Sequence, residues 1–486
     1  MVRRERLALA LLTLLAAALR CWRLGALALV GDEAYYWAWS RHLALSYYDH
    51  PAGVALLVRL STLLGGQSEA GIRWLNAMLG VGAVPLAWRL SRRLVSARAA
   101  WTTAALVAVG KPFVIISRHV YPDGLLLVML LVGLLSIDRW LSVDERPSLT
   151  LALSLGVAMA LAFAAKYTAY VLAGVALLYG LLLRPRLARE PRFWLAIAVA
   201  ALGLAPTLVW NAQRDWASFR WQLGHLSHDV LTPVGPLARL GNLLDYVSWP
   251  LALLAGCGVL FWRWPRARLL SVVGVALALP VLLSPANTPR SLVVALPLLL
   301  GPGIEGLWRL AERHAMALPL TALLGLATLA ALGGGLSAAT VYRQLDERPC
   351  PWSGALERRM ALDAQGLRAL AGSRLDDDET ILCLDYSLAA QFTYYLGRPA
   401  VTSWPQYLEW PLPPIERVRV VSAGYLDDVC AGRALAEAYD QVSLPESLAI
   451  DKRTFDTWRA ERPALPPGEL LARLDLLRLA AEGCVR

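Results

Sequence analysis

Charged residues are scarce in this chain. They make up 17% of its 486 residues, whereas about a quarter of a typical soluble domain is charged. Hydrophobic residues make up 57%, and they gather in blocks of roughly 15–25 residues, the length that a helix needs to cross a hydrocarbon layer about 30 Å thick. This composition excludes a soluble enzyme, a disordered chain and a disulfide-rich secreted module, and it predicts an α-helical polytopic membrane protein.

Cysteines are few as well, and none of their spacings is that of a zinc site. Cys21 and Cys257 lie in or beside apolar blocks, where we interpret them as small buried hydrophobic residues. The other four lie toward the C-terminus: Cys350, Cys383, Cys430 and Cys484. An oxidising compartment would allow one or two disulfides among these four, and the sequence does not choose among the three pairings.

Basic residues mark one side of the predicted membrane bundle. Residues 1–342 carry 30 Lys and Arg against 15 Asp and Glu, a balance of +15, and residues 343–486 carry 17 against 22, a balance of −5, which together give the net charge of +10. Because Lys and Arg are retained on the cytoplasmic side, a basic excess confined to the apolar part predicts topology rather than a nucleic-acid partner.

With every arginine cluster placed in the cytoplasm, the sequence predicts about eleven spans. They fall near residues 7–27, 71–90, 98–118, 123–142, 148–164, 168–183, 193–210, 242–262, 269–285, 291–308 and 316–340. A cleaved signal peptide has the same opening as residues 1–19 and stays an alternative for the first span. An odd number of spans with a cytoplasmic N-terminus places the C-terminal part outside.

The chain therefore divides into a transmembrane domain, residues 1–342 with an outer loop at 28–70, and a domain at 343–486. In the second domain, residues 380–385 and 417–421 are typical of buried strands. Residues 387–396 are typical of a helix that ends at Gly397. We expect a small α/β domain here.

Two groups of polar residues suggest metal binding, but each has a simpler interpretation. His225, His228 and Asp229 lie in a long outer loop, where solvated side chains are expected. The acidic run Asp376–Glu379 is similar to the metal clamp of nucleotide-sugar enzymes. Since nucleotide sugars are cytoplasmic and this domain is expected outside, we expect a solvated turn. No obligatory cofactor or metal is predicted, although a divalent metal would be compatible.

Acidic and basic residues in the short outer segments are the candidates for chemistry. Asp32 and Glu33 follow the first span, and Asp123 opens a later one; each could provide a base, or each could cap a helix. For residues 31–51, rich in Tyr and Trp, an interfacial anchor is a further alternative. Lys166 and Arg290 lie at outer turns, where the charge rule gives no reason for a cation. They suggest a bound phosphate, or a contact with lipid headgroups.

Lys111 lies inside or at the upper edge of a span. A lysine at that depth is costly and functional by default, although its side chain could also reach the surface along the helix.

Three stretches resemble a known family: Asp32-Glu-Ala-Tyr-Tyr-Trp37, Tyr47-Tyr-Asp-His-Pro51 and Tyr121-Pro-Asp123. With the span pattern of residues 1–310, they resemble the polyprenyl-phosphate-sugar-dependent glycosyltransferases of the GT-C membrane fold. The most similar branch contains the bacterial lipid A aminoarabinose transferase, the galacturonosyl transferases of lipopolysaccharide and relatives of protein O-mannosyltransferases.

The resemblance implies a role for each candidate. Asp32 would be the general base on the acceptor hydroxyl, Glu33 its partner that orients the acceptor or holds the loop, and Asp123 a second acid at the mouth of the cavity. The donor phosphate would be bound by basic residues: Lys166, Arg290, His50 and Lys111. Substrate contacts would come from three tyrosines of these stretches, Tyr35, Tyr48 and Tyr121, and from Tyr167. The aminoarabinose branch has a lysine where this chain has His50, which argues against an aminoarabinose donor.

The implied reaction is an inverting sugar transfer from a polyprenyl (undecaprenyl) phosphate to an acceptor, either a glycolipid such as lipid A or a protein. A carboxylate would take the acceptor proton and cations would stabilise the departing phosphate. Membrane lipids would surround the spans. Two rival classes stay open at this point. A flippase or transporter would need charges near the bilayer midplane and repeat-related broken helices, and a membrane scaffold would leave the outer acids and cations without a purpose.

Overall fold

The computed structural model describes residues 3–142, 147–183, 185–227, 236–260, 267–284, 289–340, 378–422, 428–450 and 453–474. They form two compact units. The first, here called the membrane unit, holds residues up to Leu24 and the helices between Ala44 and residue 340; the second, here called the C-terminal unit, combines Gly25–Leu43 with the strands and helices after residue 378. The sequence places residues 1–342, with the outer loop at 28–70, in one domain, whereas residues 25–43 pack in the C-terminal unit.

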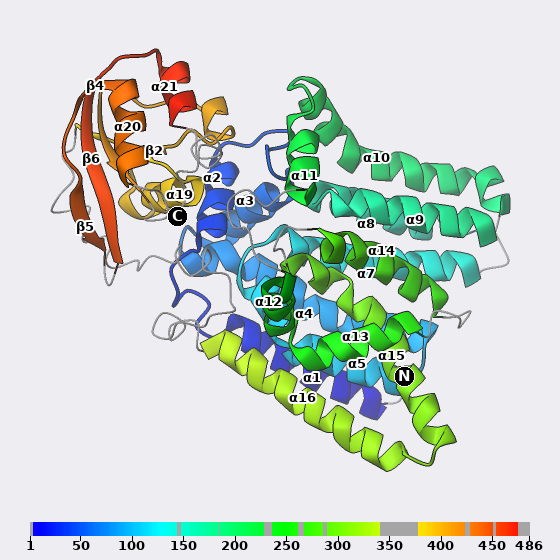
Figure 1. Ribbon diagram of the computed structural model, residues 1–486. Helices are drawn as coiled ribbons and strands as arrows, with labels where there is room; N and C mark the ends of the chain where they lie inside the picture. The colour runs from blue at the N-terminus through cyan, green and yellow to red at the C-terminus, as the bar shows by residue number, and fades with distance from the viewer. Residues whose placement is uncertain are drawn as a thin grey trace. The chain divides into compact units, whose positions relative to one another are not determined.

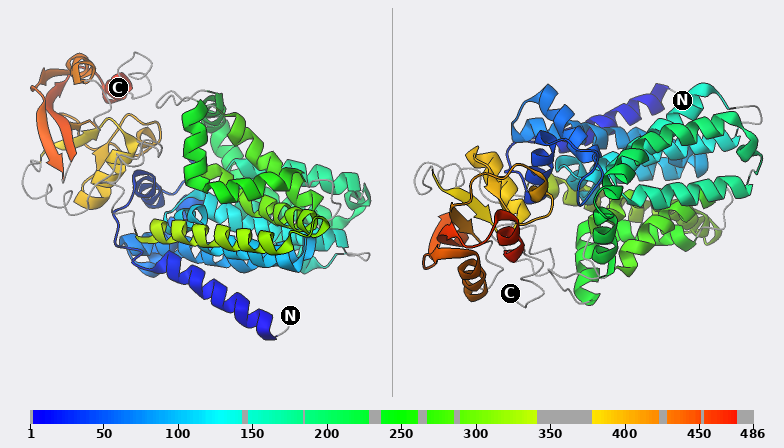
Figure 2. Two further views of the ribbon diagram at one scale, coloured as in Figure 1. Left: turned by 60° about the horizontal axis from the view of Figure 1, so that its bottom comes forward. Right: turned by 90° about the horizontal axis from the view of Figure 1, so that it is seen from above.

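The membrane unit consists of helices (Figure 1). They are α1 (Arg3–Cys21), α3 (Gly53–Gly65), α4 (Glu69–Leu94), α5 (Ala97–Val109), α6 (Lys111–Arg118), α7 (Pro122–Ser142), α8 (Leu149–Ala165), α9 (Thr168–Leu183), η1 (Pro185–Arg189), α10 (Pro191–Ala212), α11 (Ala217–Ser227), α12 (Pro236–Val247), α13 (Trp249–Leu260), α14 (Arg268–Leu283), η2 (Pro289–Val294), α15 (Leu296–Arg313) and α16 (Ala317–Thr340). Helices α8 and α10 lie side by side in each view of Figures 1 and 2.

Each of the eleven predicted spans coincides, within about six residues at either end, with one helix or one bent pair of helices. By length and apolar composition alone, four described helices are long enough to cross a membrane: α4, α7, α10 and α16. Two bent pairs raise that number to six, α5 with α6 at 50° and α12 with α13 at 100°. Helices such as α8 and α14 are apolar but shorter, about 25 Å at a rise of about 1.5 Å per residue. Helix α3, an apolar helix inside the predicted outer loop, was not foreseen.

Ion pairs join several helix ends at one end of the membrane unit. Arg98, at the start of α5, donates from Nε to Glu305 Oε2 of α15 at 2.9 Å. Arg92 of α4 donates to Glu5 of α1 at 2.7 Å, and Arg93 of α4 pairs with Asp138 near the end of α7. These arginines belong to the clusters predicted to be cytoplasmic. Asp123 lies at the opposite end of α7, so the predicted inner and outer residues separate along the bundle.

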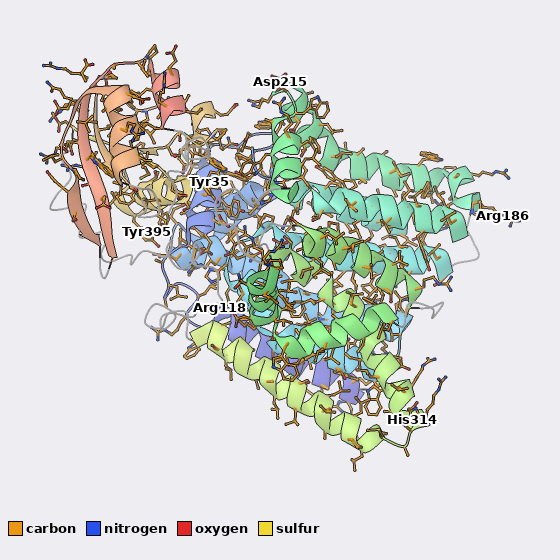
Figure 3. All side chains as sticks on the ribbon, viewed as in Figure 1. Tyr35, Arg118, Arg186, Asp215, His314 and Tyr395 are labelled. Carbon is orange, nitrogen blue, oxygen red and sulfur yellow. The ribbon has the colours of Figure 1, made fainter. Side chains whose placement is uncertain are left out.

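Buried arginines bind main-chain oxygens where helices end, in the same unit. The guanidinium of Arg118 donates through Nη1 to Leu19 O, Arg20 O and Trp22 O at 3.1, 3.1 and 2.8 Å (Figure 3). Arg20 donates in turn to Val107 O and Ala108 O, at the break between α5 and α6. The last carbonyls of a helix have no partner within it, and a cation there also complements the helix dipole. Arginine therefore takes the place that water would have at an exposed helix end.

The C-terminal unit is built on a sheet whose strands lie in the order β2-β1-β3-β6-β4, with β5 paired to β6. Its strands are β1 (Thr380–Cys383), β2 (Ala400–Val401), β3 (Arg417–Val421), β4 (Tyr439–Val442), β5 (Glu446–Ile450) and β6 (Arg453–Pro463). Its helices are α2 (Gly31–Arg41), α19 (Tyr386–Leu396), η3 (Tyr407–Glu409), α20 (Asp428–Ala438) and α21 (Pro467–Arg473). Strand β1 pairs in parallel with β2 and β3, and β6 is antiparallel to its neighbours.

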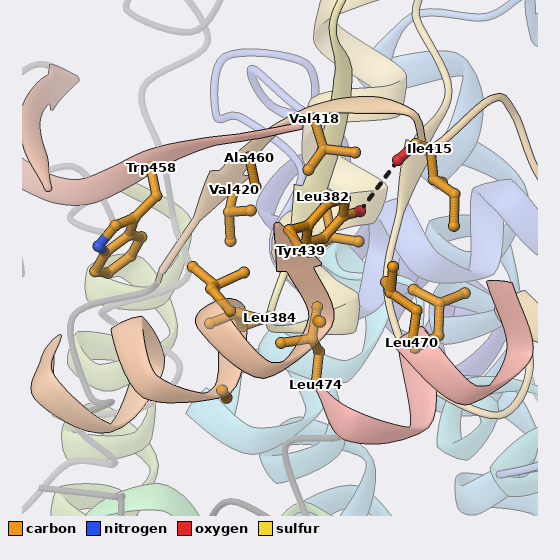
Figure 4. Close-up of a cluster of buried hydrophobic side chains, with 14 of the residues drawn as sticks. Leu382, Leu384, Ile415, Val418, Val420, Tyr439, Trp458, Ala460, Leu470 and Leu474 are labelled. Atoms are coloured by element: carbon orange, nitrogen blue, oxygen red, sulfur yellow. Dashed lines mark hydrogen bonds between the residues drawn. The ribbon is translucent and has the colours of Figure 1, made fainter. Parts of the chain in front are cut away.

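The predicted small α/β domain is confirmed. The expected strands are β1 and β3, and the expected helix is α19, which ends at Gly397 with a left-handed φ of 66°. An apolar cluster fills the space between the sheet and α20 and α21, and Figure 4 shows Tyr439 within it, donating to Ile415 O at 3.2 Å.

Cysteines and acids of the C-terminal unit give two further outcomes. Cys430 is disulfide-bonded, with its partner outside the described residues, and Cys383 is free and buried. Of the acidic run, Asp378 lies exposed beside Arg417, as expected of a solvated turn. The expectation is wrong for Glu379, whose buried carboxylate accepts from Arg419 and Arg459 at 3.2 and 3.1 Å. The carboxylate of Glu379 is therefore engaged in two ion pairs and does not lie in a solvated turn.

Replacing the guanidinium of Arg118 tests its capping role. Arg118→Met removes the partner of three carbonyl oxygens, each of which costs about 1–3 kcal/mol when left unsatisfied, so the variant should unfold several degrees below the wild type in detergent. Arg89→Met, on the exposed face of α4, should change stability by less than about 0.5 kcal/mol. Equal melting temperatures for the two variants would contradict the role.

Candidate active site

Two side chains from distant parts of the membrane unit, Asp123 and Ser291, contact Lys166. Its Nζ donates to Asp123 Oδ1 at 2.8 Å, to Asp123 Oδ2 at 3.0 Å and to Ser291 Oγ at 2.9 Å. The carboxylate of Asp123 is in the first turn of α7, and Ser291 belongs to η2. Asp123 is 1% exposed and Lys166 is 9% exposed. The contacts hold the ammonium at a fixed place near the surface of the bundle.

Local structure explains why Lys166 points there. Lys166 is the C-cap of α8, with extended backbone angles, and its N–H closes the helix on Ala162 O. A cation at a helix C-terminus and an acid in a first helical turn are both favoured by the helix dipoles. Gly53, in the first turn of α3, approaches the end of α8 so closely that an added Cβ would overlap Ala164 O. The end of α8 is therefore packed closely against the start of α3.

Arg290 brings a second cation to the same place. Its guanidinium lies 4.9 Å from the centre of the Tyr121 ring, a cation–π distance. Arg290 directly precedes Ser291, and Tyr121 comes two residues before Asp123. The cluster of Lys166, Arg290 and Asp123 thus contains two cationic side chains of the kind that binds anions.

Tyr48, His50 and Tyr167 lie on segments that pack against α11. Residues 46–51 form a tight turn in which Tyr47 N–H donates to His50 O at 3.1 Å. Gln222 of α11 donates to Asp49 O at 2.7 Å. The ring of Tyr48 lies 5.5 Å from that of Trp221, and the ring of Tyr167 lies 5.2 Å from that of Phe219. Because Tyr167 follows Lys166 directly, α11 links this turn to the Lys166 cluster.

Lys111 does not join that cluster. Its Nζ donates to Asp245 O at 2.8 Å and to Asp245 Oδ2 at 3.1 Å. Lys111 follows the break between α5 and α6, and Asp245 precedes the break between α12 and α13. The pair therefore ties two bent helices together.

The two acids of α2, in the C-terminal unit, have different surroundings. Glu33 is fully buried, and its Oε2 accepts from Val30 N–H at 3.1 Å, so it closes the N-terminus of its own helix. Asp32 is partly exposed, and its Oδ1 accepts from the Tyr386 hydroxyl at 3.1 Å. The N-cap position belongs to Val30. The capping role considered for Asp32 thus falls to Glu33, and Asp32 carries the more accessible carboxylate.

Tyr35 lies in an aromatic core within the C-terminal unit. It is 2% exposed, and its ring is 4.6 Å from that of Tyr386 and 5.9 Å from that of Tyr407. Trp39 and Tyr36 are buried beside it, which argues against α2 as an interfacial anchor. A ring enclosed in this way supports α2 by packing, and direct contact with a substrate is disfavoured.

The phenol of Tyr407 stays protonated in this core. Burial raises the pKa of Tyr407 well above its ordinary value, and the nearby Cys383 and Asp385 contribute smaller shifts in the same direction. Its hydroxyl donates to the carbonyl oxygen of Tyr386 at 3.1 Å. Tyr386 is thereby held at its main chain as well as through its ring.

Metal ligands do not gather among the residues that the structure describes: no three His, Cys, Asp or Glu side chains are close enough to hold an ion. His228 and Asp229, and the side chain of His225, lie outside the described residues.

Sequence reasoning missed two residues of these clusters, Ser291 and Tyr386. Ser291 has a weak signal, since it follows the cation at the predicted outer turn. Tyr386 has none, because only the fold brings it to Asp32.

Part of the chain is similar in sequence to known glycosyltransferases. Residues 49–210 match the family model described as dolichyl-phosphate-mannose-protein mannosyltransferase. A stretch of 193 residues is 33% identical to the lipid A galacturonosyltransferase RgtD of Rhizobium johnstonii, covering 39% of this chain and 40% of that protein. The matched stretch thus spans less than half of the curated relative.

Solved structures match nearly the whole chain. The apo structure of ArnT from Cupriavidus metallidurans covers 97% of this chain and 99% of its own, with a TM-score of 0.61 and 15% identity. The structure of the same protein bound to undecaprenyl phosphate covers 94% and 98%, with a TM-score of 0.61 and 16% identity. The resemblance predicted from the sequence is confirmed at the level of the fold: this chain has the GT-C membrane fold of those glycosyltransferases.

Proposed function

We propose that this protein is an inverting glycosyltransferase of a bacterial inner membrane. It moves a sugar from a polyprenyl phosphate, such as undecaprenyl phosphate, to a hydroxyl or phosphate group of lipid A or another glycolipid. The observation that carries the proposal is the meeting of Lys166, Asp123 and Ser291, with Arg290 beside them, in a chain with the fold of an ArnT that binds undecaprenyl phosphate.

The donor phosphate is the ligand that we assign to Lys166 and Arg290. A lysine offers a compact charge with three donors, and an arginine offers a planar pair of donors suited to phosphate oxygens. Asp123 and Ser291 fix the ammonium, and the Tyr121 ring supports the guanidinium. We place Tyr48, His50 and Tyr167 near the donor as further contacts, since α11 links their segments to the turn of Lys166.

Asp32 is the carboxylate that we assign to the acceptor. It takes the proton of the acceptor hydroxyl while that oxygen forms a bond to the anomeric carbon. The bond from the anomeric carbon to the phosphate oxygen breaks at the same time, and the polyprenyl phosphate leaves with the electron pair. One displacement inverts the anomeric centre. The partial exposure of Asp32 and the structural use of Glu33 support this division of roles.

The acceptor is proposed from the relatives. Similarity to a protein named lipid A galacturonosyltransferase favours a glycolipid acceptor. The matching family model is described as a protein mannosyltransferase, so a protein acceptor is the second candidate. Mass spectrometry of lipids and glycoproteins from cells with and without the gene separates the two, because it gives the transferred mass and identifies its recipient.

A lipid-linked sugar flippase is a second candidate class, and one observation favours it. Two bent helix pairs are joined by the ion pair of Lys111 and Asp245, and broken helices with charges are typical of transporters. Purified protein in vesicles decides between the classes: covalent transfer supports the enzyme, and movement of labelled donor lipid without transfer supports the flippase.

The proposed orientation places the N-terminus in the cytoplasm and the C-terminal unit in the periplasm. It is supported by the arginine-rich helix ends around Arg92, Arg93 and Arg98, which lie away from Asp123 along α7, because basic residues are retained on the cytoplasmic side.

Removing the proposed base should abolish useful turnover. Asp32→Asn should lower kcat by about 10²–10⁴-fold while the melting temperature stays within a few degrees of the wild type, measured with purified protein, polyprenyl-phosphate sugar and lipid A. Glu33→Gln keeps an oxygen that can accept from Val30 N–H and should retain activity within about tenfold. Wild-type turnover by Asp32→Asn would remove the assignment.

Removing the proposed phosphate ligand should weaken donor binding. A hydrogen bond to a charged group contributes about 1.5–3 kcal/mol, so Lys166→Met should raise the Kd for undecaprenyl phosphate about 10–100-fold, measured by titration calorimetry in detergent. Lys111→Met removes a lysine that pairs with Asp245 and should change this Kd less than about threefold. A larger loss from Lys111→Met than from Lys166→Met would contradict the assignment.

A further inference from the structure

Helix α2, which carries Asp32, is an element of the C-terminal unit. Helix α19 contacts it along its length. Just before α2, Leu29 N–H donates to the Tyr395 hydroxyl at 2.6 Å, and Gln391 Nε2 donates to Leu29 O at 2.9 Å. Figure 3 labels Tyr35 of α2 and Tyr395 of α19 in this unit. Both main-chain groups of the residue that leads into α2 are thus held by α19.

The two helices also approach each other closely at Gly31, the first residue of α2. A Cβ added there would overlap the side chain of Ser387. Glycine is required at this point because any other residue would force α19 away from the start of α2. The distance between Asp32 and the first turn of α19 is therefore fixed by packing.

The position of Tyr386, the first residue of α19, is also fixed by its contacts. Its ring lies 4.6 Å from that of Tyr35 and 4.8 Å from that of Trp404. Its carbonyl oxygen accepts from the Tyr407 hydroxyl. The preceding Asp385 caps α19, accepting from Ser387 N–H at 2.8 Å and from Leu388 N–H at 3.0 Å. The direction in which the Tyr386 hydroxyl points is set by all of these contacts.

We infer that Tyr386 is a positioning residue for the carboxylate of Asp32. Its hydroxyl donates to Asp32 Oδ1 at 3.1 Å and holds the carboxylate in the rotamer from which it takes the acceptor proton. Tyr386 keeps its own proton, and the acceptor proton goes to Asp32. The inference rests on the proposed function, in which Asp32 is the base. This aligning residue lies more than 350 positions away from Asp32 in the sequence.

Tyr386→Phe tests this role, since it removes the hydroxyl and keeps the ring that packs on Tyr35 and Trp404. A misplaced catalytic group costs up to about 10²-fold in rate, so kcat should fall about 10–100-fold while KM for donor and acceptor changes less than about threefold. The matched control is Tyr394→Phe on the same helix, whose ring lies 4.9 Å from that of Trp37. Its kcat should stay within about twofold of the wild type.

A double variant separates this inference from the proposed function. If Tyr386 acts through Asp32, Tyr386→Phe should not lower the residual rate of Asp32→Asn any further. Full activity of Asp32→Asn would remove the role of Asp32 itself. If Asp32→Asn is inactive but Tyr386→Phe has the wild-type kcat, or the two losses multiply, the inference on Tyr386 is overturned and the proposed function stands. A lower melting temperature or a higher KM with unchanged kcat would assign Tyr386 to packing alone, which also overturns it.

Discussion

The contact between Lys166 and Asp123 is the constraint on which the membrane unit's proposed chemistry depends. Both side chains are largely buried, and a charge removed from water is costly unless an opposite charge and hydrogen bonds accompany it. Asp123 and Ser291 meet that requirement for the ammonium. In doing so they fix Lys166 between the starts of α7 and η2, where Arg290 also lies. The contacts that stabilise the lysine therefore also set the position from which we propose that it binds the donor phosphate.

Neighbouring or similar residues of one type have different surroundings in this structure. Of the two neighbouring acids in α2, one closes the helix and the other keeps an accessible carboxylate. Of the two lysines proposed for the phosphate, one joins the Arg290 cluster and the other balances Asp245 between two bent helices. Their partners distinguish the members of each pair. The sequence motif alone treats both members alike.

The sequence predicts much of the fold because the membrane simplifies the problem. Apolar blocks and arginine clusters gave the helices, since the bilayer requires long apolar segments and the charge rule orders their ends. The same two signals predict that the turns that carry Asp123, Lys166 and Arg290 lie outside. The segment of residues 25–43 was assigned to the wrong neighbours, because its packing on α19 depends on close contacts such as that of Gly31 with Ser387. Glu379 was misjudged, since long-range ion pairs leave no trace in the local sequence pattern. The pairing of Lys111 with Asp245 was not foreseen for the same reason.

The place of the donor phosphate is the most direct test of these ideas. A cryo-electron microscopy structure of the wild-type protein with bound undecaprenyl phosphate would locate it. We expect the phosphate oxygens within hydrogen-bond distance of Lys166 Nζ and the Arg290 guanidinium. A phosphate bound elsewhere, for example beside Lys111 and Asp245, with Lys166 still paired only to Asp123 and Ser291, would contradict the central claim.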